Sequence, residues 1–484
     1  MNIAYIVIDT LRYDYIGANG NDWIETPNID RFASKAWAFD RAFCASFPTI
    51  PYRTDVITGQ YGAPFHAWKP LRHERRTLPR TLAQSGYATQ LIHDTPHLVN
   101  GGHNFDWPFH AWTFVRGAEV DRDWIMDTLP VPDNWAKDEL FDCLGENDTQ
   151  SNMLRSYARA NRNRKKLEDW NCAKLFNTAA QFLKDNAKRE NFFLWVDCFD
   201  PHEPWDAPPE FMKKYDKRPG YDGRIDPRSL GGRNKRILSD AARQHIKDQY
   251  AAKLSWMDHC FGQFVDALES TGLDKKTAVI LTGDHGTNVG ERSSFGKGQP
   301  VREGEGHVPL FVRLPEGDSG RSNNIVQPQD FFPTILSLLG KDYPEGLEGH
   351  DFLTPAREGK SGDREIALSG GAIERWRNAA KNEGAILFTA FDQEWNIEVA
   401  VKLENSKLIK LGSLDYVQDE HPDVVAKLHT AAVDEIIRRG LDPAIASWLR
   451  SGGEDDFPTE CVFYDGFPGP AGYSPYFGRL YPGE

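Results

Sequence analysis

The sequence is poor in several features that reveal a protein's class at once, beginning with paired cysteines. Its cysteines are Cys44, Cys143, Cys172, Cys198, Cys260 and Cys461, and none of them are spaced as in a Cys-x-x-Cys motif. This scatter argues against both a zinc knuckle and a disulfide framework. We therefore expect reduced thiols that are mostly buried.

Long apolar runs and clusters of basic residues are lacking too. No apolar stretch approaches the roughly eighteen residues that a membrane-spanning helix needs, so we expect no membrane segment. The net charge is -14, and no block of Lys and Arg alternates with aromatic residues, so we expect no nucleic-acid groove. Local Arg and Lys side chains can still attract a small anionic ester as substrate.

No leader is apparent before the first apolar run. That run, residues 3–8, starts almost directly after Met1, which leaves no room for a signal peptide and predicts a cytoplasmic enzyme. With 484 residues, 40% of them hydrophobic, the chain can bury a large core.

What the sequence does contain is a set of apolar runs that each lead into acidic residues. Uninterrupted apolar runs are typical of buried parallel strands. The runs are residues 3–8, 192–196 and 278–282, and they lead into Asp9, Asp197, and Asp284 with His285. Because open α/β sheets bind ligands at the carboxyl ends of their strands, we expect these side chains at one edge of a sheet.

Asp9, Asp284 and His285, together with Thr49, would make a mixed oxygen and nitrogen site for a divalent metal. Hard cations prefer carboxylate oxygens, and an imidazole admits Zn or Mn. Taken alone, each Asp after a strand also fits a helix cap or a turn.

Residues 49–53, Thr-Ile-Pro-Tyr-Arg, and the later pair Thr58-Gly59 resemble the signature of type I sulfatases, a branch of the alkaline phosphatase superfamily. Sulfatases of this type oxidise a Cys or Ser to formylglycine at the position that Thr49 holds here. Threonine is not a known substrate of that modification, so the resemblance implies an ordinary alcohol. An alcohol is a weak nucleophile until a metal or a base lowers its pKa.

Further motifs extend this resemblance over nearly the whole chain. They are the opening segment 9–12, the metal segment 284–286, segments 303–304 and 308–310, and segment 330–335 before a core helix. Segment 200–204 resembles the loop whose histidine, His202 here, contacts the substrate's sulfate or phosphate. Lys297 is spaced from His285 like the substrate-binding lysine of phosphonate monoester hydrolases. The resemblance implies an alkaline-phosphatase-like α/β fold, a doubly wound mixed sheet flanked by helices, with a small C-terminal α+β subdomain.

Three departures from the sulfatase pattern concern the metal and the bound anion. Thr10 stands where many sulfatases have a second Asp, and fewer carboxylates weaken Ca binding, so Mn or Zn is favoured and Ca stays an alternative. Segment 93–98 replaces a Gly-Lys-Trp-His-Leu segment, so a sulfate-binding lysine is missing, and whether His97 holds the matching position stays open. His307 replaces an arginine, and packing, a cap or an additional metal ligand are its alternative roles.

These assignments together predict nucleophilic catalysis. The metal would lower the pKa of Thr49, and Arg53, one helical turn later, would point at the same anion. The amino terminus of that helix would add its dipole. Lys297 and His202 would bind the transferring group or protonate the leaving oxygen. Transfer would give a phospho-threonine, which is then hydrolysed.

Phosphorus is favoured over sulfur as the centre attacked. Formylglycine hydrate releases sulfate by collapsing to an aldehyde, and a sulfated threonine lacks this exit. The sequence therefore predicts a metal-dependent hydrolase of phosphomonoesters, phosphodiesters or phosphonate monoesters. Two alternatives stay open: a sulfatase that acts without formylglycine, and a non-catalytic sulfatase-like binding protein.

The sequence pattern changes near residue 365. Residues 1–365 alternate strand and helix patterns, as a doubly wound sheet requires, and form the predicted catalytic domain. Apolar residues at helical spacing predict a helix over 250–268, and residues 206–236, rich in Pro and Gly, predict a surface insertion.

Residues 366–484 form the predicted smaller subdomain. Antiparallel strands are predicted over 385–389 and 398–403, and an amphipathic helix over 423–439. The tail after Gly452 is rich in aromatic residues, Pro and Gly, and must pack on its own domain or on a second subunit. The second arrangement would make the protein a homo-oligomer.

Overall fold

The computed structural model describes most of the chain, and the structural statements concern those residues. They are residues 1–62, 64–65, 68–100, 102–119, 121, 125, 129–130, 149–216, 240–373, 376, 382, 384–454 and 457–458.

An eight-stranded sheet with the order β10-β2-β9-β6-β1-β5-β3-β4 forms the centre of the fold. Its strands are β1 (Asn2–Ile8), β2 (Trp37–Ala42), β3 (Ala88–His93), β4 (Ala111–Phe114), β5 (Phe192–Cys198), β6 (Thr277–Gly283), β9 (Leu310–Arg313) and β10 (Gly320–Val326). Neighbouring strands are parallel, except that β9 runs antiparallel to β6 and β2. The sheet grows outward from β1 on both sides, which confirms the predicted doubly wound, mixed architecture.

β1, β5 and β6 lie side by side in the middle of this sheet, and all their residues are buried. Burial on both faces explains why their sequences are continuous apolar runs rather than alternating patterns. Ile8 is in register with Cys198 on one side and with Gly283 on the other. Asp9 and Asp284 therefore leave neighbouring strands at the same edge of the sheet.

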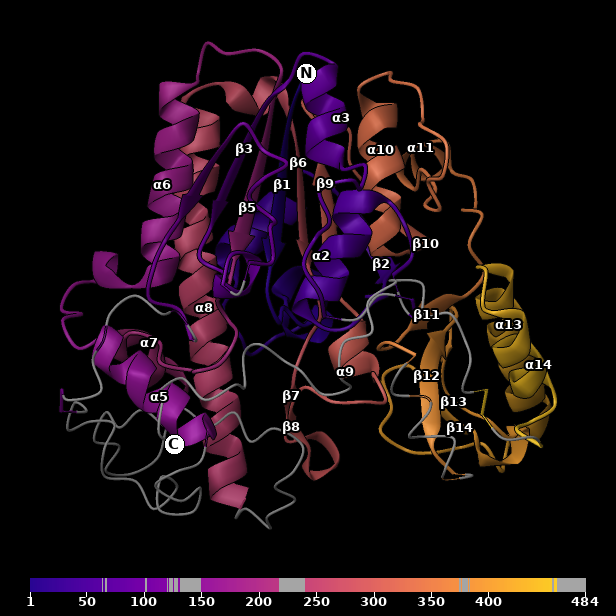
Figure 1. The fold of residues 1–484 in the computed structure, drawn as a ribbon. Helices are drawn as coiled ribbons and strands as arrows, with labels where there is room; N and C mark the ends of the chain where they lie inside the picture. The colour runs from indigo at the N-terminus through magenta and orange to yellow at the C-terminus, as the bar shows by residue number, and fades with distance from the viewer. Residues whose placement is uncertain are drawn as a thin grey trace.

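Helices cover both faces of the sheet (Figure 1). One face packs against α1 (Pro27–Ala33), α6 (Asn171–Asp185) and α8 (Asp240–Ser270), and the other against α2 (Thr49–Thr58), α3 (Leu78–Gln84), α10 (Phe331–Leu338) and α11 (Leu353–Arg357). Smaller elements are α5 (Thr149–Ala160), α7 (Pro209–Tyr215), α9 (Glu303–Gly306), β7 (Asn288–Val289) and β8 (Phe295–Gly296). The strand residues alternate between the two core clusters, so each face has its own apolar layer.

α8 contains the helix predicted over 250–268. The apolar residues that predicted it are fully buried: Tyr250, Leu254, Met257, Phe261, Phe264, Val265 and Leu268. Phe261 contacts Phe32 of α1 and Phe176 of α6 edge to face, with ring centroids 5.5 and 5.9 Å apart. The aromatic stripe is thus core, as the sequence predicted.

A second, four-stranded antiparallel sheet begins at Ala367, just after the predicted division at residue 365. It comprises β11 (Ala367–Ser369), β12 (Ile386–Phe391), β13 (Trp395–Ala400) and β14 (Lys407–Lys410), and it packs with α13 (Pro422–Arg438) and α14 (Pro443–Arg450). The small C-terminal α+β unit is therefore confirmed. The strand predicted over 398–403 is wrong at its end, because Ile397 and Val399 face the core whereas Leu403 is 41% exposed.

The predicted surface insertion at 206–236 is wrong in its first part. There α7 buries Phe211 and Met212 in the same core cluster as α8. Residues 217–239 lie outside the described residues, and so does the predicted aromatic tail from residue 459 onward. The role of that tail in an oligomer stays a prediction.

The described residues include four of the cysteines and all of the helices named above. The described cysteines Cys44, Cys172, Cys198 and Cys260 are free thiols and buried. Within the same residues, every helix is too short or too polar to span a bilayer.

Replacing Phe261 with Ala is expected to lower the free energy of unfolding by about 3–5 kcal/mol, because it leaves a cavity between three helices. Urea denaturation followed by circular dichroism measures the loss. Asp266→Ala in the same helix is the matched control, since Asp266 is 68% exposed and pairs with Arg31 at the surface. The control should change stability by no more than about 1 kcal/mol. Equal losses in the two variants would contradict the core position of Phe261.

Candidate active site

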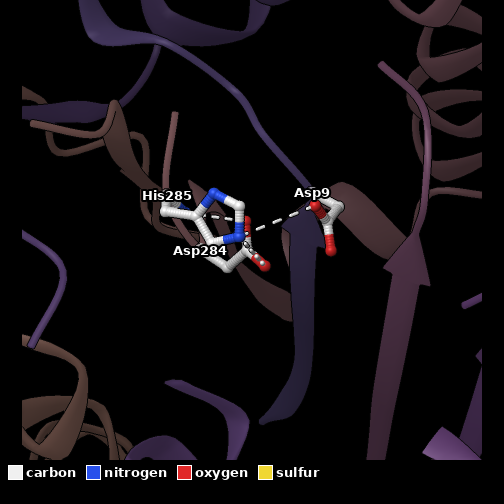
Figure 2. A group of neighbouring side chains, drawn as sticks. All are labelled: Asp9, Asp284 and His285. Carbon is white, nitrogen blue, oxygen red and sulfur yellow. Dashed lines mark hydrogen bonds and ion pairs between the residues drawn. The ribbon is translucent and has the colours of Figure 1, made fainter. Parts of the chain in front are cut away.

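Asp9, Asp284 and His285 meet at the carboxyl edge of the central strands (Figure 2). His285 Nε2 lies 3.9 Å from Asp9 Oδ1 and 3.6 Å from Asp284 Oδ2. One possible ligand atom from each residue lies within 4.8 Å of the others, and all three side chains are buried. The structure thus brings these three residues together, as the sequence predicted. Asp9, Asp284 and His285 are called the metal group below.

Unpaired polar atoms in this group fit a cation. Asp9 Oδ1 and His285 Nε2 are buried without a hydrogen-bond partner among the described residues. His285 Nδ1 bonds to the Gly286 carbonyl at 2.8 Å, so Nδ1 carries the proton and Nε2 presents a lone pair. Burial, and then the neighbouring Asp284 carboxylate, raise the pKa of Asp9 well above its ordinary value. A divalent cation held by these atoms would satisfy the lone pairs and offset the carboxylate repulsion.

Thr10 holds the backbone beside this group in an unusual conformation. Its φ is 57°, and a β-branched residue in this region costs about 1–3 kcal/mol. The Thr10 N–H donates to Asp284 Oδ1 at 3.0 Å, and its Oγ1 is buried without a partner among the described residues. The strained backbone therefore turns an amide toward Asp284 and fixes that carboxylate.

The guanidinium of Arg53 links three strand ends. It is completely buried, and its Nη1 donates to Asp284 at 2.6 Å while its Nη2 lies 3.4 Å from Asp9. Nε and Nη2 form a bidentate pair with Asp197, with both distances 2.8 Å. Burial opposes the charge, but Asp197 and Asp284 outweigh it and raise the pKa of Arg53 well above its ordinary value. Arg53 thus stays charged while it contacts both carboxylates of the metal group.

Asp197 is a site residue to which the sequence analysis gave no role. Besides Arg53, it accepts hydrogen bonds from Thr95 Oγ1 at 2.6 Å and from Trp195 Nε1 at 3.2 Å. Its signal was the same as that of Asp9, an acidic residue at the end of an apolar run. What the sequence did not show is the register, which pairs Asp197 with Val7 and brings it within reach of Arg53.

Thr49 is the first residue of α2, and it is 2% exposed. Its carbonyl accepts a hydrogen bond from Arg53 Nη1 at 3.0 Å, and the same nitrogen bonds to Asp284. The start of the helix therefore lies beside the metal group. Free N–H groups and the positive end of the helix dipole favour an anion at this place.

Lys297, His202 and Glu203 form a second charged cluster. Lys297 Nζ is hydrogen-bonded to His202 Nε2 and lies 3.2 Å from Glu203 Oε1. His202 Nδ1 donates to the Glu203 carbonyl at 2.6 Å, so Nδ1 carries a proton. Because Nε2 accepts from the Lys297 ammonium, it carries none, and the ring is neutral. Burial lowers the pKa of His202 to about 4, in agreement with a neutral ring. The predicted partners Lys297 and His202 are thus in direct contact.

The loop that carries His202 is fixed by buried ion pairs. Lys253 of α8 lies 2.6 Å from Asp206 and 3.1 Å from Asp200, and it donates to the Pro204 carbonyl at 2.9 Å. Arg164 pairs with the other oxygen of Asp206 at 2.5 Å. Buried pairs of this kind define geometry more than they add stability, and losing one partner costs about 3–5 kcal/mol. The network therefore determines where His202 lies.

Glu119 adds a carboxyl group that no sequence motif marked. Its Oε2 lies 3.6 Å from His97 Nε2, and the His97 ring packs against Trp68 and Phe199. Burial raises the pKa of Glu119, while the positive charge of Lys297 acts in the opposite direction. His97 and Glu119 therefore border the Lys297 cluster.

His307 is not among the three residues of the metal group, and its role as an additional ligand stays a prediction. Its Nε2 bonds to the Asp40 carbonyl at 2.9 Å, its Nδ1 lies 3.6 Å from Glu303, and its ring stacks on Tyr13 at 3.8 Å. Nε2 is thus engaged with the Asp40 carbonyl, and Nδ1 lies near a carboxylate. His307 also lines a separate cavity of about 580 Å³ that extends to Asn396 of the C-terminal sheet.

Comparison with known proteins identifies the family. The family model described as Sulfatase matches residues 1–341. The chain belongs to the sulfatase family. It is therefore a hydrolase of the sulfatase type, acting on sulfuric or phosphoric ester bonds, and members of this superfamily are metal-dependent.

Relatives and solved structures of this sulfatase family member include both sulfate and phosphonate enzymes. An arylsulfatase of Clostridium perfringens is 26% identical over 372 residues, which cover 72% of this chain and 76% of the relative. The multifunctional alkaline phosphatase superfamily protein PehA of Trinickia caryophylli is 23% identical over 419 residues, 75% of this chain and 78% of PehA. The structure of a phosphonate monoester hydrolase from Silicibacter pomeroyi superposes with a TM-score of 0.67 at 21% identity, covering 90% of this chain and 95% of that chain. This likeness confirms the alkaline-phosphatase-like fold.

Asp284→Asn is expected to weaken metal binding by at least about tenfold, since loss of outer-shell partners alone reaches that range. The amide keeps the shape of the side chain but removes its charge. Elemental analysis after dialysis against Mn, Zn, Ca and Mg measures the metal bound per chain. His307→Gln is the control and should bind as much metal as the unaltered protein. Metal content unchanged by Asp284→Asn would show that the cation, if bound, lies elsewhere.

Proposed function

We propose that this sulfatase family member hydrolyses phosphate esters, whether phosphomonoesters, phosphodiesters or phosphonate monoesters, with unmodified Thr49 as the nucleophile. The observation that carries the proposal is the position of Thr49, which is the first residue of α2. Arg53 Nη1 donates to both the Thr49 carbonyl and Asp284, so Thr49 lies beside the metal group. The similarity to a phosphonate monoester hydrolase and to PehA supports it.

A divalent cation held by Asp9, Asp284, His285 and the Thr49 hydroxyl would act as a Lewis acid that lowers the pKa of that hydroxyl. Two carboxylates and one imidazole among these ligands suit Mn or Zn, with Ca as an alternative.

Thr49 Oγ1 attacks phosphorus in the first step, so that a bond from phosphorus to Thr49 forms as the bond to the leaving oxygen breaks. Thr49 gives up its hydroxyl proton to water in this step, and the leaving oxygen takes up one proton, so the proton count is unchanged. Lys297 binds a non-bridging oxygen of the phosphoryl group or supplies the proton to the leaving oxygen. His202, whose Nε2 accepts from Lys297, orients the ammonium. The N–H groups of α2 stabilise the added negative charge, and Arg53 holds the start of this helix beside Asp284.

Water attacks the phosphorus of phospho-Thr49 in the second step, and the threonine oxygen leaves with a proton. The products are the free phosphate or phosphonate and the regenerated alcohol. A sulfated threonine lacks the collapse to an aldehyde that releases sulfate from formylglycine. This difference favours phosphorus over sulfur.

A sulfatase that acts without formylglycine is the second candidate. Sulfatase relatives are the more numerous, and the arylsulfatase of Clostridium perfringens aligns over 72% of this chain. This candidate predicts faster release of sulfate than of phosphate from esters with the same leaving group.

Thr49→Ala is expected to lower kcat for aryl phosphate esters by at least about a thousandfold, because no other group takes over the attack. Thr49→Ser, with its intact mass confirming an unoxidised serine, keeps the hydroxyl and is the matched control, expected within about tenfold of the unaltered enzyme. Chromogenic phosphate, phosphonate and sulfate esters with one leaving group, assayed with each metal, provide the rates.

Mass spectrometry of the enzyme quenched during turnover should find a phosphoryl adduct on the peptide that contains Thr49. Undiminished turnover by Thr49→Ala would refute the nucleophile, and faster sulfate release would favour the second candidate.

A further inference from the structure

The only ammonium group in the described cluster next to the metal group has a carboxylate partner of its own. Lys297 lies 3.2 Å from Glu203 Oε1, and both side chains are largely buried, 17% and 4% exposed. Burial opposes the Lys297 charge, but Glu203 and then Asp9 outweigh it and raise the pKa of Lys297. Lys297 is therefore one half of a largely buried ion pair.

The other cation of the site is compensated as well. Arg53 bonds to Asp197 with two nitrogens and also contacts Asp284 and Asp9, so three carboxylates surround one guanidinium. The three carboxylates and Arg53 have a net charge of -2, and the Glu203–Lys297 pair adds no net charge. One divalent cation cancels this difference.

The histidines near Lys297 do not change this balance. His202 accepts a hydrogen bond from the ammonium at Nε2, which a protonated ring cannot do. Burial lowers the pKa of His97 to about 3, so it is uncharged at neutral pH. Glu119, 3.6 Å from His97, adds a negative charge whenever it is ionised.

We propose that the site selects esters whose transferring group carries one negative charge over those that carry two, and that Glu203 sets this selection by neutralising Lys297. The substrate class would then be phosphodiesters, phosphonate monoesters or sulfate esters rather than dianionic phosphomonoesters. The inference rests on the proposed function, which places the ester between Thr49 and Lys297. Its physical basis is that a buried site with no net charge cannot compensate a second anionic oxygen, whose repulsion by nearby carboxylates is little screened.

Glu203→Gln tests the selection, because the amide keeps the size of the side chain and removes its charge. We measure kcat/KM for p-nitrophenyl phosphate, a dianion at pH 8, and for methyl p-nitrophenyl phosphate, a monoanion with the same leaving group. The ratio of the dianion value to the monoanion value should rise at least about tenfold in Glu203→Gln. A ratio rather than a rate is compared, since a general structural defect would lower both values together.

Two further variants complete the test. Glu119→Gln should raise the same ratio by a smaller factor, because Glu119 makes no hydrogen bond to Lys297 among the described contacts. Glu303→Gln is the matched control, since Glu303 binds the Gly412 N–H and lies near His307, outside the metal group. Glu303→Gln should leave the ratio unchanged. Thermal unfolding and metal content of each variant establish that it is folded and loaded.

A ratio that stays within about twofold in folded, metal-loaded Glu203→Gln and Glu119→Gln would overturn the inference. So would an unaltered enzyme that prefers the dianion. These results would leave Thr49 as nucleophile untouched. Conversely, the unaltered enzyme could cleave only p-nitrophenyl sulfate, which would refute phosphate esters as substrates. This result would agree with selection for a single negative charge. The Glu203→Gln ratio would then compare p-nitrophenyl phosphate with p-nitrophenyl sulfate.

Discussion

The buried guanidinium of Arg53 is the interaction on which the rest of the site depends. Parallel pairing of β1 with β5 and β6 brings Asp9, Asp197 and Asp284 to one edge, where burial makes their mutual repulsion strong. Arg53 contacts all three and supplies one positive charge. Two negative charges are left over, and a divalent cation matches them. The candidate metal site is thus the part of this charge cluster that the protein leaves uncompensated.

The same guanidinium connects the cluster to the helix that carries the proposed nucleophile. Because Nη1 bonds to both Thr49 and Asp284, the start of α2 cannot shift without breaking a buried ion pair. Breaking such a pair typically costs about 3–5 kcal/mol. Stability and reactivity therefore depend on one side chain. The loop with His202 is held in a comparable way, through Lys253 and its carboxylate partners.

Much of this arrangement was predictable, because it depends on local patterns. Continuous apolar runs predicted β1, β5 and β6, and the acidic residues after them predicted that Asp9 and Asp284 would meet at one edge of the sheet. The aromatic spacing of α8 predicted a buried helix. The errors came where tertiary packing decides: β13 starts earlier than predicted, and the segment after Asp206 folds into the core as α7.

The sequence by itself determined the sheet, the order of its motifs and the threonine at the nucleophile position, because period and composition are properties of the chain. Only the tertiary structure decided which charges meet. It paired Asp197 with Arg53 and Glu203 with Lys297, brought Glu119 beside His97, and directed His307 to Asp40. The physical reason is that electrostatic energy depends on distance and burial, and contacts between residues far apart along the chain exist only once the sheet has set its register.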